Sequence, residues 1–161
     1  MRKIAVFTTG GTIDKVYFDA NSDYKVGEPL ISSLLKKFKV NFDFEVRTLF
    51  RKDSLDLTPD DRQQIFKAVE ESKQTKILIT HGTDTLVDTA SVLSSIKDKT
   101  IVLTGALLPA TFKETDAEFN IGTALGVLWS QGPGVFVAMN GCVFPWHDVV
   151  KNRSKGKFEN L

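Results

Sequence analysis

Short apolar runs alternate with longer helix-like stretches, and this alternation restricts the fold of the chain more than any other feature. Five segments have the composition of strands: residues 4–7, 42–49, 76–79, 101–103 and 135–138. Four of them are continuous apolar runs, as expected for strands that are covered on both faces. The segment 42–49 alternates apolar and polar residues instead, which indicates a half-exposed strand near an edge of the sheet.

Helix-like stretches lie between these strands. The clearest begins at Thr58, whose hydroxyl can cap the helix, with Pro59 in the first turn. Strands and helices in alternation predict an α/β fold with a single doubly wound, mainly parallel sheet and helices on both faces. The other expected helices run over residues 29–35, 86–96 and 119–129.

One long segment has neither the helix nor the strand period. Residues 12–26 are polar and aromatic, and they directly follow the first predicted strand. Loops of this length inside a compact domain are usually functional or disordered. We therefore expect this segment to be a loop that acts as a lid.

Length and charge exclude several classes of protein. A chain of 161 residues is typical of one domain, and 21 basic against 20 acidic residues leave a net charge of +1. This balance gives no electrostatic footprint for nucleic acid or for an anionic membrane, and the basic run 151–157 is interpreted as solvated. The apolar run 4–7 is too short for a signal peptide or a membrane span, so a cytoplasmic protein is expected.

The sequence gives little support for metal or redox chemistry. Cys142, the only cysteine, is interpreted as a buried and inert thiol. His81 and His147 are the only histidines, and no metal-ligand spacing links them to Cys142. We expect no metal and no cofactor.

Glycine and threonine gather where the predicted strands end. The first strand runs into Thr-Thr-Gly-Gly-Thr at 8–12, the third into Thr-His-Gly-Thr-Asp-Thr at 80–85, and later ones into Thr-Gly-Ala at 104–106 and Asn-Gly at 140–141. Ligands of open α/β sheets bind beyond the carboxyl ends of the strands. Glycine lets backbone N–H groups approach a ligand, and threonine supplies uncharged hydroxyls. This rim therefore has the groups needed to attack an acyl carbon and to hold the resulting oxyanion.

Each of these residues also has a purely structural interpretation. Gly10 and Gly11 alone fit a tight turn as well as they fit a catalytic loop. Thr83 and Thr85 are also consistent with helix caps, and Asp84 is consistent with a favourable charge in the first helical turn. Two Gly-Thr turns at adjacent strand ends are harder to explain by capping alone, which favours the catalytic interpretation.

Five segments, in the same order, resemble the bacterial-type L-asparaginase family. Thr-Gly-Gly-Thr-Ile at 9–13 and Thr-His-Gly-Thr-Asp-Thr at 80–85 look like its two signature motifs. Residues 23–27, 52–56 and 148–151 resemble its flexible-loop tyrosine segment, its substrate-binding serine turn and the segment that carries its active-site lysine. The resemblance implies the Rossmann-like or flavodoxin-like fold of the family's N-terminal domain.

The resemblance also implies catalytic roles. Thr12 would be the nucleophile that attacks the side-chain amide of L-asparagine, with Tyr24 on the lid beside its hydroxyl. Thr83, Asp84 and Lys151 would move protons and activate the water that releases L-aspartate from an acyl-threonine intermediate.

Further positions would bind the substrate. Ser54 and Asp84 would hold the α-carboxylate and α-ammonium groups, which fixes the amide carbon within reach of a weak nucleophile. The backbone N–H groups of Gly11 and Thr83 are expected to hold the oxyanion. Gly82 and Leu55 belong to the same substrate-binding set, and Leu55 stands where the family commonly has glutamine.

The chain departs from the family in length. Family members commonly have a second, C-terminal domain, and a carboxylate from that domain of a neighbouring subunit completes the site. This chain ends at Leu161, just after the match to the lysine segment. We therefore expect one domain over residues 1–161, without the C-terminal domain, that resembles the compact asparaginases.

Two other functions stay open at this stage. One is a binding module for asparagine or aspartate with little turnover, and the other is an amidase that prefers glutamine or another small amide. His81 is expected to orient the backbone, and Trp129 to lie in the core. The aromatic segment 144–146 is expected to be exposed and to favour a homo-oligomer, a dimer or a tetramer.

Overall fold

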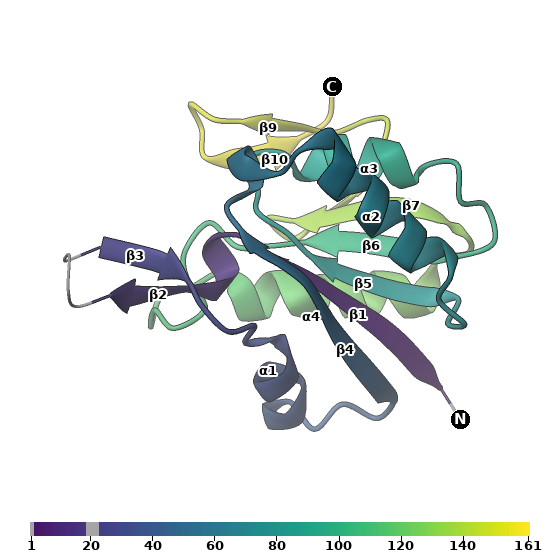
Figure 1. Cartoon of the computed structure of the whole chain (residues 1–161), viewed down its shortest axis with the longest axis horizontal. Coiled ribbons are helices and arrows are strands. Elements are labelled where there is room, and N and C mark those ends of the chain that lie inside the picture. Colours follow the sequence, from purple (N-terminus) through teal and green to yellow (C-terminus); the bar gives the residue numbers. More distant parts are fainter. Residues whose placement is uncertain (1, 19–22) are drawn as a thin grey trace.

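A twisted central sheet with helices on both faces forms the core of the computed structural model, which describes residues 2–18 and 23–161 (Figure 1). All neighbouring strands of the sheet are parallel except the last pair, which is antiparallel. In spatial order the strands are β4 (Asp43–Lys52), β1 (Lys3–Gly10), β5 (Lys76–Thr80), β6 (Thr100–Thr104), β7 (Gly134–Met139) and β8 (Cys142–Pro145).

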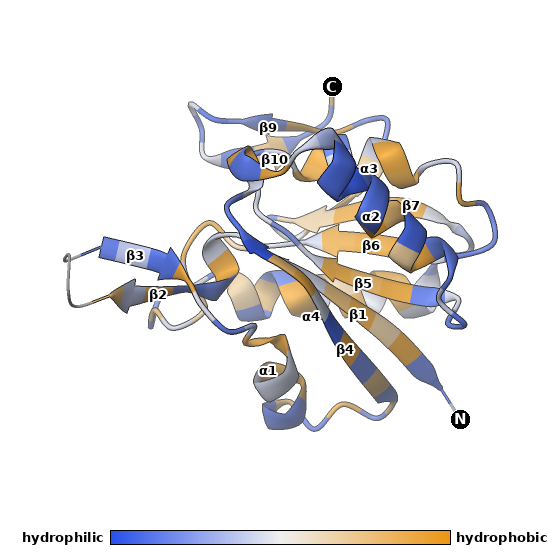
Figure 2. Ribbon diagram, viewed as in Figure 1, coloured by the Kyte–Doolittle hydropathy of each residue, from blue (hydrophilic) through white to orange (hydrophobic). Residues whose placement is uncertain are grey.

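Two apolar layers enclose this sheet. The helices α2 (Pro59–Glu70) and α3 (Leu86–Leu93) cover one face, and α1 (Ile31–Lys37) and α4 (Ala117–Ser130) cover the other. Successive strand residues point to opposite faces, so Ala5 and Phe7 pack toward α2 and α3, whereas Ile4 and Val6 pack toward α1 and α4. Both faces need apolar residues, and the inner strands are accordingly apolar along their length (Figure 2). The doubly wound α/β fold is confirmed.

Two small antiparallel hairpins extend beyond the central sheet. One consists of β2 (Lys15–Phe18) and β3 (Asp23–Val26), and the other of β9 (Val150–Asn152) and β10 (Lys157–Glu159). The expectation of a loop over residues 12–26 is therefore wrong for the described part, in which a 3₁₀ turn over Thr12–Asp14 leads into the first hairpin. Cross-strand pairs such as Tyr17–Tyr24 stabilise that hairpin. Residues 19–22 of the expected lid lie outside the described residues.

Several boundaries differ from the sequence-based expectation. The alternating segment does form the edge strand β4, although this strand continues to Lys52. The first helix begins at Ile31 rather than at Pro29, and the third ends at Leu93 because residues 94–96 turn toward β6. The fourth begins at Ala117, two residues before its expected start. No helix within the described residues is both long enough and apolar enough to cross a bilayer.

The edge strand β8 corrects two expectations about side chains. Cys142 is exposed rather than buried, because it lies at the start of this outermost strand. Phe144 is buried rather than exposed, because it faces the α2–α3 layer and packs into its core. Trp129, expected in the core, is only half-buried and packs against the outside of the other layer, with its ring centroid 5.3 Å from that of Phe42.

The cap expected at Thr58 is present and is reciprocal. The Thr58 hydroxyl accepts the N–H of Asp61 at 3.1 Å, and the Asp61 carboxylate accepts the N–H of Thr58 at 2.9 Å. Lys52, at the end of β4, donates to the same carboxylate at 2.8 Å. This capping box fixes α2 relative to the rim of the sheet.

Removal of the cap should weaken the fold. Thr58→Ala leaves an N–H group of α2 without its acceptor, so the free energy of unfolding should fall by about 1 kcal/mol in urea denaturation. Thr58→Ser keeps the hydroxyl and should unfold close to the wild type. Equal stabilities of the alanine and serine variants would show that the cap contributes nothing.

Candidate active site

Close backbone packing joins the carboxyl ends of β1 and β5 to the turn after β4. Gly11 has φ 87°, and a Cβ atom at this position would overlap with the backbone of Gly82. A Cβ atom on Gly82 would in turn lie 2.6 Å from the Cβ of Ser54. Only glycine permits this approach at both positions. The packing places Thr12 and Thr83, the next residues along the chain, at the same rim as Ser54.

Lys151 lies between two residues of the turn after β5. Its ammonium nitrogen donates to the hydroxyl of Thr83 at 2.7 Å and to a carboxylate oxygen of Asp84 at 2.8 Å. The lysine side chain is 16% exposed and that of Asp84 is 31% exposed, so the ion pair is partly shielded from water. Arg153 approaches the same oxygen at 3.7 Å. The structure thus brings together the three residues that were expected to form one polar constellation.

The threonines after β5 do not act as helix caps through their side chains. Thr85 precedes α3, yet its hydroxyl donates to the backbone oxygen of Ser54 at 2.8 Å. The N–H of Thr85 donates to the Ser54 hydroxyl oxygen at 3.3 Å, and Ser54 is only 2% exposed. These bonds connect the serine turn to the start of α3.

The turn that contains Ser54 is also held by the β2–β3 hairpin. Asp53 accepts the N–H of Leu55 at 3.1 Å, and the ammonium group of Lys15 in β2 lies 3.1 Å from its other oxygen. Burial acts to raise the pKa of Asp53, but the Leu55 N–H and the Lys15 ammonium together outweigh it and lower the pKa below its usual value. Leu55 itself is 63% exposed.

His81 orients the backbone that leads to Thr83. Its Nδ1 lies 2.7 Å from the carbonyl oxygen of Gly82, which can only accept, so Nδ1 carries the hydrogen and Nε2 accepts from the Thr89 hydroxyl at 2.7 Å. Burial lowers the pKa of His81 to about 4, against the opposing effect of its bond to Gly82. A neutral histidine thus fixes the Gly82–Thr83 peptide, as the sequence suggested.

One of the two expected oxyanion donors is already engaged. The N–H of Gly11 donates to the carbonyl oxygen of Lys52 at 2.9 Å, across a register shift between β1 and β4. That assignment is therefore wrong, because this N–H is already used by the strand pairing. Among the described hydrogen bonds none uses the N–H of Thr83, so this group stays a candidate donor.

Tyr24 lies on β3 and packs against other aromatic rings. Its centroid is 5.7 Å from that of Tyr17 and 5.6 Å from that of Phe112, both in edge-to-face geometry, and the residue is 44% exposed. The described hydrogen bonds include none between Tyr24 and Thr12. The expected tyrosine is thus not hydrogen-bonded to the expected nucleophile within the described residues.

Some residues near the site carried no signal that sequence reasoning could use. Phe112 meets Tyr24 from the loop after β6, far away along the chain. Lys15 lies two residues after the first motif, but its pairing with Asp53 depends on the hairpin that was not expected. Asn140 carried only its place in the Asn-Gly turn after β7, where it has φ 55°.

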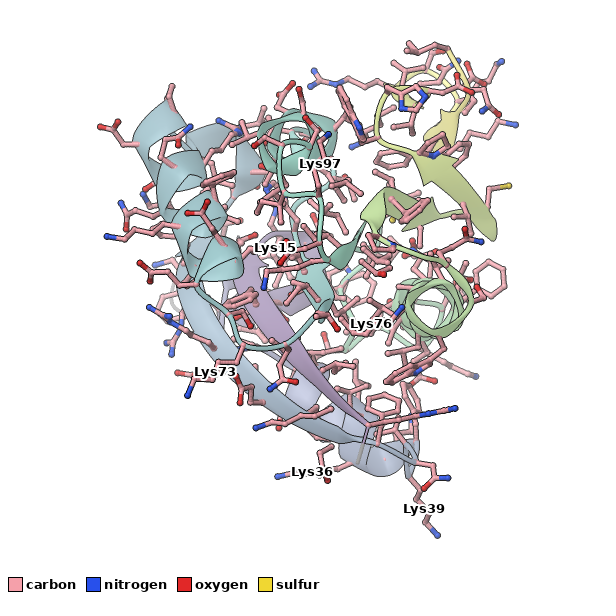
Figure 3. The ribbon with its side chains drawn as sticks, turned by 90° about the vertical axis from the view of Figure 1, so that its right-hand side faces the viewer. Lys15, Lys36, Lys39, Lys73, Lys76 and Lys97 are labelled. Carbon is pink, nitrogen blue, oxygen red and sulfur yellow. The ribbon has the colours of Figure 1, made fainter. Side chains whose placement is uncertain are left out.

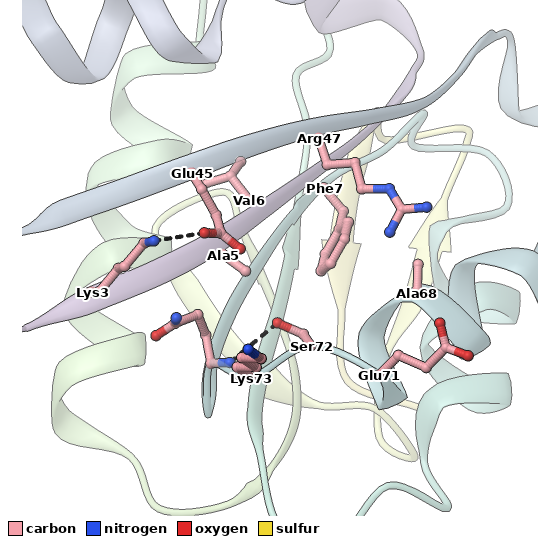
Figure 4. A pocket seen from close by; sticks show the side chains of 11 residues that line it. Lys3, Ala5, Val6, Phe7, Glu45, Arg47, Ala68, Glu71, Ser72 and Lys73 are labelled. Carbon is pink, nitrogen blue, oxygen red and sulfur yellow. Dashed lines mark hydrogen bonds and ion pairs between the residues drawn. The ribbon is translucent and has the colours of Figure 1, made fainter.

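Cavities on the surface differ in their distance from this rim. A hollow of about 240 Å³ lies between α3 and β9, and its lining includes Lys151, Asp84 and Val149. A larger one, of about 520 Å³, lies at the amino ends of β1 and β4, where Lys3 pairs with Glu45 at 2.6 Å (Figure 4). Ligands of such sheets bind at the carboxyl ends, which favours the smaller hollow. Within the described residues no group of three or more histidine, cysteine or acidic side chains could hold a metal ion.

Asp14 is a buried acid at the base of the first hairpin. One carboxylate oxygen accepts the N–H of Leu30 at 3.0 Å, and the other is buried without a hydrogen-bond partner. Its backbone oxygen accepts the N–H of Gly27 at 2.8 Å, which closes the hairpin. Burial raises the pKa of Asp14 to about 6, against the opposing effect of the Leu30 N–H.

A family model described as the N-terminal part of asparaginase matches residues 3–158. The chain belongs to the asparaginase family. A probable periplasmic L-asparaginase of Haemophilus influenzae is 35% identical over 159 residues, which cover 92% of this asparaginase-family chain and 46% of the relative. The L-asparaginase of Thermococcus kodakarensis is 36% identical over 142 residues, which cover 84% of the chain and 43% of the relative.

Solved asparaginase structures share the fold along the whole chain. The thermostable enzyme of Thermococcus kodakarensis superposes with a TM-score of 0.86 at 31% identity, over 99% of this chain and 51% of that one. A probable cytoplasmic L-asparaginase of Campylobacter jejuni gives a TM-score of 0.83 at 26% identity, over 99% and 52%. This asparaginase-family chain thus spans about half the length of the relatives it matches.

The buried carboxylate of Asp14 makes the stability of the fold depend on pH. Because the pKa of Asp14 rises from 3.8 to about 6 on folding, the folded state holds more protons between these pH values, and stability falls as pH rises through them. Asp14→Asn removes this titration and keeps an oxygen for Leu30. Relative to the wild type, the variant should therefore gain up to roughly 3 kcal/mol of unfolding free energy between pH 4 and pH 7.

Urea denaturation of both proteins across this pH range measures the difference. The contribution of His81 is common to both proteins and cancels. A difference that stays constant with pH would contradict the raised pKa of Asp14.

Proposed function

We propose that this chain hydrolyses the side-chain amide of L-asparagine to L-aspartate and ammonia. Membership of the asparaginase family supports this function. The observation that carries it is the position of the Lys151 ammonium group, which is held between the Thr83 hydroxyl and the Asp84 carboxylate. A shielded lysine, a hydroxyl and a carboxylate in contact form a proton-transfer group beside the rim that also holds Thr12.

The first half-reaction uses Thr12 as the nucleophile. Its oxygen attacks the amide carbon, the proton of its hydroxyl passes to the amide nitrogen, which leaves as ammonia, and an ester of the threonine remains. The N–H of Thr83 supports this step as an oxyanion donor, since His81 fixes the adjacent carbonyl in the opposite direction. In this proposal the β2–β3 hairpin moves so that Tyr24 reaches the nucleophile. Tyr24 then loses its contact with Phe112 and contacts the substrate instead.

The second half-reaction uses the lysine group. Lys151 reacts in this step as the neutral amine, after its ammonium group has given a proton to the solvent. A water molecule attacks the ester carbon, its proton passes through the Thr83 hydroxyl to the amine, and the lysine returns that proton to the Thr12 oxygen as L-aspartate leaves. Asp84 orients the amine in this step and, with Ser54, binds the α-ammonium and α-carboxylate groups of the substrate. Because Ser54 is buried, the substrate has to approach its hydroxyl from the rim of the sheet.

The same proposal includes the state of the protein in the cell. We take residues 1–161 as one domain that holds the proposed site residues, in a homo-oligomer, a dimer or a tetramer, located in the cytoplasm. The name of the Campylobacter jejuni relative agrees with that location, whereas the name of the Haemophilus influenzae relative gives the periplasm. Analytical ultracentrifugation and cell fractionation test these two points.

Ammonia release from L-asparagine by the purified chain tests the activity. Thr12→Val removes the nucleophile and should lower kcat by at least about 10³-fold. Lys151→Met removes the proton acceptor and should lower kcat by about 10² to 10⁴-fold. A wild type no faster than both variants would overturn the proposed function.

Matched controls separate the chemistry from the fold. Thr8→Val removes a buried hydroxyl without a partner from the same strand as the first motif, and Lys155→Met removes an exposed ammonium group from the same hairpin as Lys151. Both controls should keep the wild-type kcat.

Two further measurements separate the alternative functions. The ratio of rates on asparagine and glutamine defines the substrate, and calorimetry that shows tight binding of asparagine without turnover would instead support a binding module.

A further inference from the structure

The catalytic lysine of the proposed reaction lies outside the central sheet. Lys151 is on β9, which pairs with β10 and not with the six-stranded sheet. Its direct cross-strand partner is Phe158, whose side chain is 3% exposed and packs into the α2–α3 layer. The position of the β9–β10 hairpin therefore determines whether the lysine reaches Thr83 and Asp84.

One side chain joins this hairpin to the carboxyl rim of the sheet. The N–H of Phe158 points away from β9 and donates to the side-chain oxygen of Asn140 at 2.8 Å. Asn140 directly follows β7 and has φ 55°, a left-handed backbone conformation that few residues other than glycine adopt. Asparagine tolerates this conformation and also supplies an acceptor, which glycine cannot.

Asn140 is itself held by a buried network. Its N–H donates to the side-chain oxygen of Asn120 at 3.2 Å, and Asn120 is fully buried. The amide nitrogen of Asn120 donates to the backbone oxygen of Gly105 at 2.9 Å and to Asp116 at 2.8 Å. Gly105 follows β6 and packs against the backbone of His81. A line of hydrogen bonds and packing thus runs from the turn that carries Thr83 to the hairpin that carries the lysine.

We propose that Asn140 is a positioning residue, which docks the β9–β10 hairpin through Phe158 so that Lys151 contacts Thr83 and Asp84. This inference rests on the proposed function, in which the lysine accepts a proton. Asn140 has no described hydrogen bond to any of the three residues, so in this inference it acts on them through the hairpin. Loss of its acceptor should leave the sheet intact and displace the lysine.

Two variants at one position separate the acceptor from the backbone conformation. Asn140→Gly accepts the left-handed backbone and removes the oxygen that holds Phe158, so kcat on asparagine should fall by about 10- to 100-fold with little change in KM. Asn140→Asp tolerates the same backbone and keeps an acceptor, so kcat should stay within about threefold of the wild type. Equal losses in both variants would overturn the inference.

A second measurement tests whether the effect passes through the lysine. Asn140→Gly should cause no further loss of activity in a Lys151→Met background, because the group that it positions is already absent. Losses that multiply in the double variant would show that Asn140 acts by another route, and they would also overturn the inference.

Hydrogen exchange gives a readout that does not depend on activity. The amide of Phe158 should lose protection in Asn140→Gly and keep it in Asn140→Asp. Lys39 has the same kind of backbone, with φ 50°, and lies at the opposite end of the molecule from β9 and β10 (Figure 3). Lys39→Gly should change neither exchange at Phe158 nor kcat.

The outcomes distinguish the inference from the function on which it rests. Unchanged exchange at Phe158 in Asn140→Gly overturns the positioning role whatever the protein hydrolyses. A wild type without activity on asparagine overturns the proposed function, and exchange at Phe158 then decides whether Asn140 docks the hairpin.

Discussion

The close contact between Gly11, Gly82 and Ser54 is the constraint on which the rest of the site depends. Three chain segments meet there with only the small side chain of Ser54 between them, and any Cβ atom on either glycine would separate them. The contact positions the residues that follow each glycine, Thr12 and Thr83, at one rim. The surrounding hydrogen bonds, from Thr85 to Ser54 and from His81 to Gly82, hold an arrangement that this packing first makes possible.

Around that contact the polar groups divide into fixed and movable sets. His81 is buried and neutral, so the peptide that it orients does not change with pH near neutrality. The side chains of Asp84 and Lys151 are partly exposed, so they are accessible from the solvent. Tyr24 lies on a hairpin whose aromatic contacts are largely at the surface. The site thus combines a rigid donor with groups that can rearrange around a ligand.

The sequence predicted the sheet well, because strands buried on both faces must be apolar throughout. The edge strand also followed from the alternation in 42–49, and the grouping of Thr83, Asp84 and Lys151 followed from the resemblance to a family. Strands β8, β9 and β10 have only three or four residues, too few for a period to be recognised. The engagement of the Gly11 N–H depends on a register shift between β1 and β4, which no local pattern of residues encodes.

The lysine meets Thr83 although 68 positions separate them in the sequence, and it does so from a hairpin that the sheet does not include. The site therefore cannot assemble from the strands β1 to β7 alone, even where their packing is complete. During synthesis the segments that carry Thr12 and Ser54 precede the hairpin that brings Lys151 to Thr83. Cleavage by a protease between residues 140 and 150 would release the hairpin from the sheet, so that Lys151 would lose its tether to Thr83 and Phe158 its place in the α2–α3 layer.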